Sequence, residues 1–168
     1  MGAVAQRNML RFVKKNPSVI SSVIDKDVFF SVILAIASAE SGYGTSSAAK
    51  NRNNFFGIGN GTTSFNSPKE SFEFQVNLFY QQPYLSKKVT LAKTPYEQLR
   101  LIADSGYYSG NNDYSLPKEQ RPPYKKWTAK QSADKYYNTL KQFVDDALIA
   151  IPVGKITSKN QHQILASI

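Results

Sequence analysis

The stretch from residue 28 to residue 39 is the most apolar part of the chain, and it limits the folds that the sequence can adopt. Its letters, VFFSVILAIASA, place apolar side chains on almost every side of a helix. A membrane-spanning helix needs about 20 apolar residues, so this run of about a dozen is too short to span. The run therefore predicts a central helix, from Val28 to Ser41, that is covered by other parts of the domain.

Amphipathic patterns on both sides of this run predict helices that pack around it. Residues 4–15 carry apolar side chains at helical spacing and stop before Asn16-Pro17. Ser67-Pro68-Lys69-Glu70 is typical of a helix start, so a helix is expected from there to about residue 80. Asp25 or Asp27 is expected to cap the central helix. Other helices are expected at 18–24, 84–91, 95–103 and 129–149.

Residues 51–67 differ in character from these helical segments. Glycine and asparagine alternate there with phenylalanine and isoleucine. This pattern predicts a small hairpin with strands at 55–58 and 62–65 around the turn 59–61. The expected fold class is therefore α+β, mostly α, with residues 1–150 as one domain and 151–168 as a C-terminal tail.

The chain is basic, with 21 Lys and Arg against 12 Asp and Glu and a net charge of +9. A basic protein is attracted to polyanions such as nucleic acid, an anionic membrane or an anionic cell wall. The sequence shows no Arg-rich recognition helix and no nucleic-acid-binding motif, so a nucleic-acid partner is not expected. The charge alone does not choose between an anionic membrane and an anionic cell wall.

Several chemistries are excluded by residue usage. The chain has no cysteine, which removes disulfides, thiolate metal sites and a cysteine nucleophile. The single histidine, His162, lies in a polar segment, which argues against a Ser-His-Asp triad and a histidine metal site. No metal and no cofactor is expected. The N-terminus lacks the apolar core of a secretory signal, so export is expected through lysis, a phage particle or a secretion apparatus.

Glu40 lies in the last turn of the expected central helix and is the strongest candidate for a catalytic residue. The apolar residues before it favour desolvation, which raises the pKa of a carboxyl group, and the helix C-terminus acts in the same direction. A carboxyl group that holds its proton near neutral pH can protonate a leaving oxygen, as glycosidases require. Gly42 and Gly44 leave space beside Glu40 for a polymer.

Two blocks near Glu40 indicate the substrate class. The run Glu40-Ser-Gly-Tyr-Gly-Thr-Ser46 is followed by Asn53-Asn-Phe-Phe-Gly-Ile58. In order and spacing, they resemble the signature of the bacterial glucosaminidase family of peptidoglycan hydrolases, which includes flagellar rod-cap enzymes, autolysins and phage lytic domains. The resemblance covers roughly residues 10–148 and is weaker at 103–114. It implies a lysozyme-like helical domain with a cleft beside the small β lobe and Glu40 at the cleft floor. It further implies an endo-β-N-acetylglucosaminidase that cuts the glycan of the cell wall.

The second catalytic group is less well defined. Family members often carry a second carboxylate in the hairpin, whereas residues 56–67 contain neither Asp nor Glu. Glu70 and Tyr114 are therefore candidates to act with Glu40, and Asp104 and Asp113 are further carboxylates in reach. The residues that the resemblance and the aromatic content indicate for substrate binding are Tyr43, Asn54, Phe56, Tyr107 and Tyr108.

Alternative functions remain open at this stage. One carboxylic acid can serve substrate-assisted hydrolysis, an inverting attack by water or a lytic transglycosylase, and a muramidase would act on the same polymer. A non-catalytic wall-binding module of a phage or secretion apparatus is a further alternative. In each case the partner is peptidoglycan, the site of action is the wall, and the chain acts as a monomer or within such an assembly.

Overall fold

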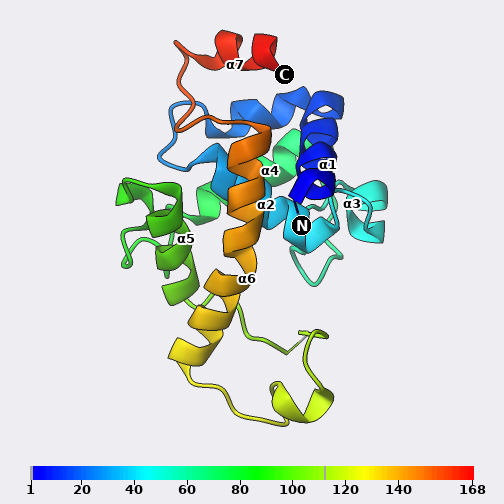
Figure 1. Cartoon of the computed structure of the whole chain (residues 1–168), viewed down its shortest axis with the longest axis vertical. Helices are drawn as coiled ribbons and strands as arrows, with labels where there is room; N and C mark the ends of the chain where they lie inside the picture. Colours follow the sequence, from blue (N-terminus) through cyan, green and yellow to red (C-terminus); the bar gives the residue numbers. More distant parts are fainter. Residues whose placement is uncertain (1, 112) are drawn as a thin grey trace.

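The fold is organised around one buried helix. A computed structural model describes residues 2–111 and 113–168 of the chain. Helix α2 (Phe30–Ser41) lies at the centre, and α6 (Ala129–Ala150) and α5 (Pro95–Asp104) pack against it (Figure 1). Every side chain from residue 30 to residue 38 is buried. The central helix expected from the apolar run is therefore confirmed.

The N-terminus of α2 is stabilised from inside the protein and not by an aspartate cap. The backbone N–H of Phe29 donates a hydrogen bond to Gln98 Oε1 at 2.9 Å, and Gln98 Nε2 donates to the carbonyl of Asp27 at 2.9 Å. Because this helix end is buried, a partner from the neighbouring helix α5 can reach it. The expected cap from Asp25 or Asp27 is wrong, since Asp25 accepts from Ser158 N and Asp27 pairs with Lys155.

Helix α1 (Gly2–Lys15) packs along α6 and confirms the helix expected at residues 4–15. It ends where Asn16 Nδ2 donates to the carbonyl of Phe12 at 3.0 Å. Pro17, which has no backbone N–H, then begins the 3-10 helix η1 (Pro17–Val23). Helix α4 (Pro68–Leu78), capped by Ser67 as expected, packs against η1.

The remaining elements are short or lie in long connections. They are α3 (Ser47–Arg52), η2 (Val89–Leu91), η3 (Lys118–Gln120) and α7 (Gln161–Ser167). The segment 84–91, expected as a helix, is mostly turns and has only η2 at its end. Helix α6 begins with a capping box, in which Thr128 and Gln131 bond each other's backbone N–H groups.

The expected β-hairpin does not form, and in residues 2–111 and 113–168 the structure has no strand at all. Residues 53–66 instead make a loop of successive turns around the side chain of Asn54. Asn54 Nδ2 donates to the carbonyls of Ile58 and Thr63 at 2.9 and 3.0 Å, and its Oδ1 accepts from Ile58 N at 3.0 Å. Gly57, Gly59 and Gly61 all have positive φ, which favours turns over extended strands. The mostly helical part of the fold prediction is confirmed, and the β lobe is replaced by this loop.

Residues after α6 pack back onto the domain. Ile156 is buried, its carbonyl accepts from Asp25 N at 2.9 Å, and Ile164 of α7 is buried against the core. Helix α7 lies at the opposite end of the molecule from the long loop between α5 and α6 (Figure 1). Within the described part of the chain, none of the helices has both the length and the apolar character of a membrane span.

The fold makes a stability prediction at its centre. Ile33 is 0 % exposed in α2, so Ile33→Ala leaves a cavity and is expected to lower the free energy of unfolding by about 2–5 kcal/mol. Val4 is 59 % exposed on α1, so Val4→Ala is expected to change the free energy of unfolding by less than about 0.5 kcal/mol. Urea unfolding followed by circular dichroism measures both values. Equal effects of the two substitutions would contradict a fold centred on α2.

Candidate active site

Glu40 lies at the mouth of a cavity of about 260 Å³. Three segments build this cavity: the C-terminal turn of α2, the loop that follows α5, and the middle of α6. The residues that line it are Ala39, Glu40, Tyr108, Asp113, Tyr136, Thr139 and Leu140. Since α2 is buried up to residue 38, its last turn is the point at which the central helix first reaches solvent.

The Glu40 carboxyl is accessible to solvent, yet protein atoms surround it closely. The backbone of Gly57 lies so near that a Cβ placed there would be 3.8 Å from Glu40 Oε2. In such a hollow, water solvates the carboxylate less well than at a convex surface, and this desolvation raises the pKa of Glu40 above 4.5. The carboxyl therefore keeps its proton to higher pH than a surface glutamate and remains in contact with anything that enters the cavity.

Asp113 lines the same cavity and has the opposite electrostatic character. Its burial alone would raise the pKa, but hydrogen bonds from Ser115, the nearby Tyr108 hydroxyl and the charge of Lys135 lower the pKa below 3.8. Lys135 Nζ lies 3.4 Å from Asp113 Oδ2, and Ser115 N donates to Oδ1 at 3.1 Å. Asp113 is therefore held as a carboxylate, in the same cavity as a glutamate whose pKa is raised.

Tyr136 on α6 also lines the cavity, and its hydroxyl is buried behind the cavity wall. Tyr136 is 2 % exposed, and within the described residues its hydroxyl has no hydrogen-bond partner. Burial, Tyr107 and Glu40 all raise the pKa of Tyr136, so the hydroxyl remains protonated. An unpaired buried donor costs free energy, which a ligand in the cavity can recover by accepting from it.

The loop that carries Asp113 is held by one close contact. Gly110 is buried against Trp127, and a Cβ at this position would lie 2.4 Å from the indole ring. The indole Nε1 donates to the carbonyl of Gln120 at 3.1 Å, and Arg121 Nη1 donates to the carbonyl of Asp113 at 3.3 Å. Only glycine fits at position 110, and the packing that this permits positions Asp113 over the cavity.

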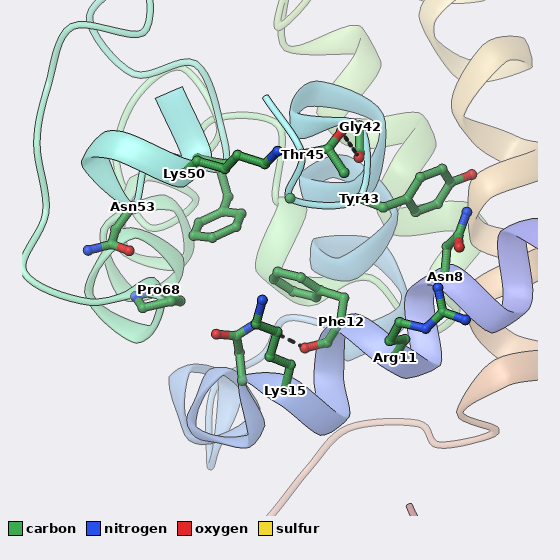
Figure 2. A pocket seen from close by; sticks show the side chains of 14 residues that line it. Asn8, Arg11, Phe12, Lys15, Gly42, Tyr43, Thr45, Lys50, Asn53 and Pro68 are labelled. Atoms are coloured by element: carbon green, nitrogen blue, oxygen red, sulfur yellow. Dashed lines mark hydrogen bonds between the residues drawn. The ribbon is translucent and has the colours of Figure 1, made fainter. Parts of the chain in front are cut away.

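The structure brings some of the predicted site residues together. Glu40 and Tyr108 share the cavity, and Tyr107 packs behind it with its ring 5.3 Å from that of Tyr136. Tyr43 lines a separate and larger pocket, which is bounded by α1 and α3 (Figure 2). Tyr43 thus lies three residues after Glu40 in the chain, but it lines a different pocket.

The other predicted residues lie outside the cavity. Asn54 is buried and holds the 53–66 loop, and Phe56 packs edge-on against Phe72 at 5.0 Å in the core. Glu70 accepts from Asn66 N at 2.6 Å at the start of α4. Tyr114 is 77 % exposed, with Arg121 4.4 Å above its ring.

Sequence reasoning missed the part of the site that α6 supplies. Tyr136, Thr139 and Leu140 lie three and four residues apart, so they share one face of the helix. The signal was present, because a tyrosine and a threonine with polar ends adjoin an otherwise apolar inward stripe. In the sequence, Asp113 was one candidate carboxylate among several. It is the packing of its loop that places Asp113, and not the other candidates, in the cavity.

A cavity with two carboxyl groups whose pKa values are shifted in opposite directions is typical of glycoside hydrolases. The comparison with family models agrees with this class. The glucosaminidase family model, described as mannosyl-glycoprotein endo-beta-N-acetylglucosaminidase, matches residues 16–149, and the chain belongs to this family of glycoside hydrolases. No curated protein and no solved structure matches the chain.

The raised pKa of Glu40 predicts a stability effect with a definite sign. Ionisation of Glu40 is harder in the folded protein than in the unfolded chain, so the contribution of Glu40 to stability is fully present below its unfolded-state pKa and is lost as pH rises through its folded-state pKa. Glu40→Gln imitates the protonated form and is expected to be more stable than the wild type at pH 7.

Urea unfolding at pH 4 and pH 7 tests this expectation. The advantage of Glu40→Gln should shrink at pH 4, while Glu119→Gln, at an exposed position, should stay within about 0.5 kcal/mol of the wild type at both pH values. A Glu40→Gln protein that is less stable than the wild type at pH 7 would show that the carboxylate is stabilised in the cavity.

Proposed function

We propose that the protein is an endo-β-N-acetylglucosaminidase that hydrolyses β-1,4 glycosidic bonds of peptidoglycan. The observation that carries this proposal is the pair of carboxyl groups in one solvent-accessible cavity, with the pKa of Glu40 raised and that of Asp113 lowered. Family membership supplies the reaction class, and the two carboxyl groups supply an acid and a base for it.

Glu40 is the general acid. It donates its proton to the oxygen of the glycosidic bond while the bond from that oxygen to the anomeric carbon breaks. The leaving sugar departs as a neutral alcohol, and Glu40 becomes a carboxylate. Its carboxyl is placed for this step because it ends a buried helix and is still open to the cavity.

Asp113 is the general base. It accepts a proton from the water whose oxygen attacks the anomeric carbon, so the second product carries a new hydroxyl. Asp113 gains one proton in this step while Glu40 loses one to the leaving oxygen. Lys135 and Ser115 stabilise the carboxylate form of Asp113 that this step requires. In this proposal Asp113 is the second carboxylate, which residues 56–67 do not supply.

Tyr136 positions the substrate. Tyr136 lines the cavity, and its buried hydroxyl has no partner in the described structure; once a substrate opens access to it, this hydroxyl can donate to an amide carbonyl. The N-acetyl group of N-acetylglucosamine carries such a carbonyl next to the anomeric carbon. A sugar that lacks the acetamido group would leave the Tyr136 donor unpaired, which gives the cavity a basis for selectivity.

The bacterial cell wall is the proposed site of action. The net charge of +9 supports it, because positive charge speeds the encounter with an anionic polymer. The Glu-Ser-Gly block at 40–42 and the Asn-Phe-Phe-Gly block at 54–57 support it through their resemblance to wall hydrolases.

The proposal predicts the effect of removing either carboxyl group. Glu40→Gln and Asp113→Asn are each expected to lower kcat on purified murein by about 10²–10⁴-fold, which is the usual contribution of a positioned acid or base. Glu73→Gln, in an exposed ion pair with Lys69, is the matched control and should keep wild-type kcat. Release of soluble fragments from murein measures all three, and circular dichroism checks folding.

Analysis of the new reducing ends separates the competing chemistries. An N-acetylglucosamine end supports the proposal, whereas an N-acetylmuramic acid end identifies a muramidase and an anhydro end identifies a lytic transglycosylase. Binding of the wild type to murein with no release of fragments would identify a non-catalytic wall-binding module. Full activity of folded Asp113→Asn would remove that residue from the mechanism.

A further inference from the structure

A second pocket of about 670 Å³ lies outside the Glu40 cavity. Figure 2 shows it from close by: α1 forms one side, α3 another, and the loop 42–45 closes the top. We propose that this pocket binds the carboxylate-bearing peptide stems of the wall polymer. The proposal rests on the proposed function and extends it from the glycan strand to the peptides attached to that strand.

Charge is the first observation that supports an anionic ligand. Arg11 and Lys15 on α1 and Lys50 on α3 line the pocket, and no acidic residue lines it. In the part of the chain that the structure describes, none of these three cations forms an ion pair with a carboxylate. Three like charges around one hollow repel one another, and an anion bound between them relieves that repulsion.

One acidic residue that acts on the pocket residue Tyr43 already has a hydrogen-bond partner. Asp146 on α6 is buried, accepts from Gln6 Nε2 at 3.0 Å and contributes to the raised pKa of Tyr43. It does not line the pocket. The positive charge of the pocket is therefore available to a ligand.

The walls favour a peptide over a simple anionic polymer. Phe12, Tyr43 and Phe55 supply apolar surface, and Asn8 supplies an amide that can both donate and accept hydrogen bonds. A peptide offers methyl groups, backbone amides and carboxylates together, which match these three kinds of surface. A phosphodiester polymer offers charge but little apolar surface.

The pocket also lies close to the proposed catalytic residue along the chain. Gly42, Tyr43 and Gly44 border it and lie two to four residues after Glu40. Because each residue spans at most about 3.6 Å, the backbone of Tyr43 is within roughly 11 Å of that of Glu40. A polymer bound at Glu40 is thus within reach of this pocket through its side branches.

The test measures binding in a protein that cannot turn over its substrate. In the Glu40→Gln background, isothermal titration with peptide stems released from murein by an amidase gives Kd. The triple change Arg11→Gln, Lys15→Gln and Lys50→Gln is expected to weaken binding roughly tenfold, since exposed ion pairs contribute modestly. The control changes Lys87, Lys93 and Lys159, all exposed, to Gln; it loses the same charge and should leave Kd unchanged.

Each other outcome overturns the proposal. Equal Kd for the triple variant and the control shows that the pocket does not bind the stems. A loss of binding only for poly(glycerol phosphate) assigns the pocket to a phosphodiester polymer. If the triple variant fails to fold, the single change Lys50→Gln, at an exposed position, is used in its place. Wild-type digestion of murein reports separately on the proposed function, so the two failures remain distinguishable.

Discussion

The burial of α2 is the constraint on which the rest of the structure depends. Its side chains are apolar on almost every side, so α5 and α6 pack over it, and Gln98 satisfies its buried N-terminus. Only the last turn escapes this cover, and Glu40 lies there. The same packing that stabilises the core therefore brings one carboxyl group to a hollow in which water is reduced but substrate can enter.

The helical part of the fold was predictable because it follows from local patterns. The apolar run, the Pro at position 17 and the Ser67-Pro68 start are signals that act within a few residues. The 53–66 loop was not predictable in the same way. Alternating apolar residues and a Gly-Asn-Gly turn indicate a hairpin, but the side chain of buried Asn54 takes the backbone partners that a second strand would need.

Of the residues that line the cavity, the sequence pointed to Glu40 as the acid and to Tyr108 for substrate binding. Glu40 has local signals, namely the apolar run before it and the glycines after it. Asp113 depends on long-range packing, because Gly110 must contact Trp127 before the loop can bring this carboxylate to the cavity. Tyr136 is buried at an inward position of α6 and lines the cavity, and its hydroxyl has no partner in the described residues.

The central claim is that one cavity holds a glutamic acid with a raised pKa and an aspartate with a lowered pKa. A carbon-13 NMR titration of the side-chain carboxyl groups, assigned with Glu40→Gln and Asp113→Asn, tests it most directly. The account predicts a pKa above 4.5 for Glu40 and below 3.8 for Asp113. Two ordinary values, or the reverse order, would contradict the assignment of acid and base.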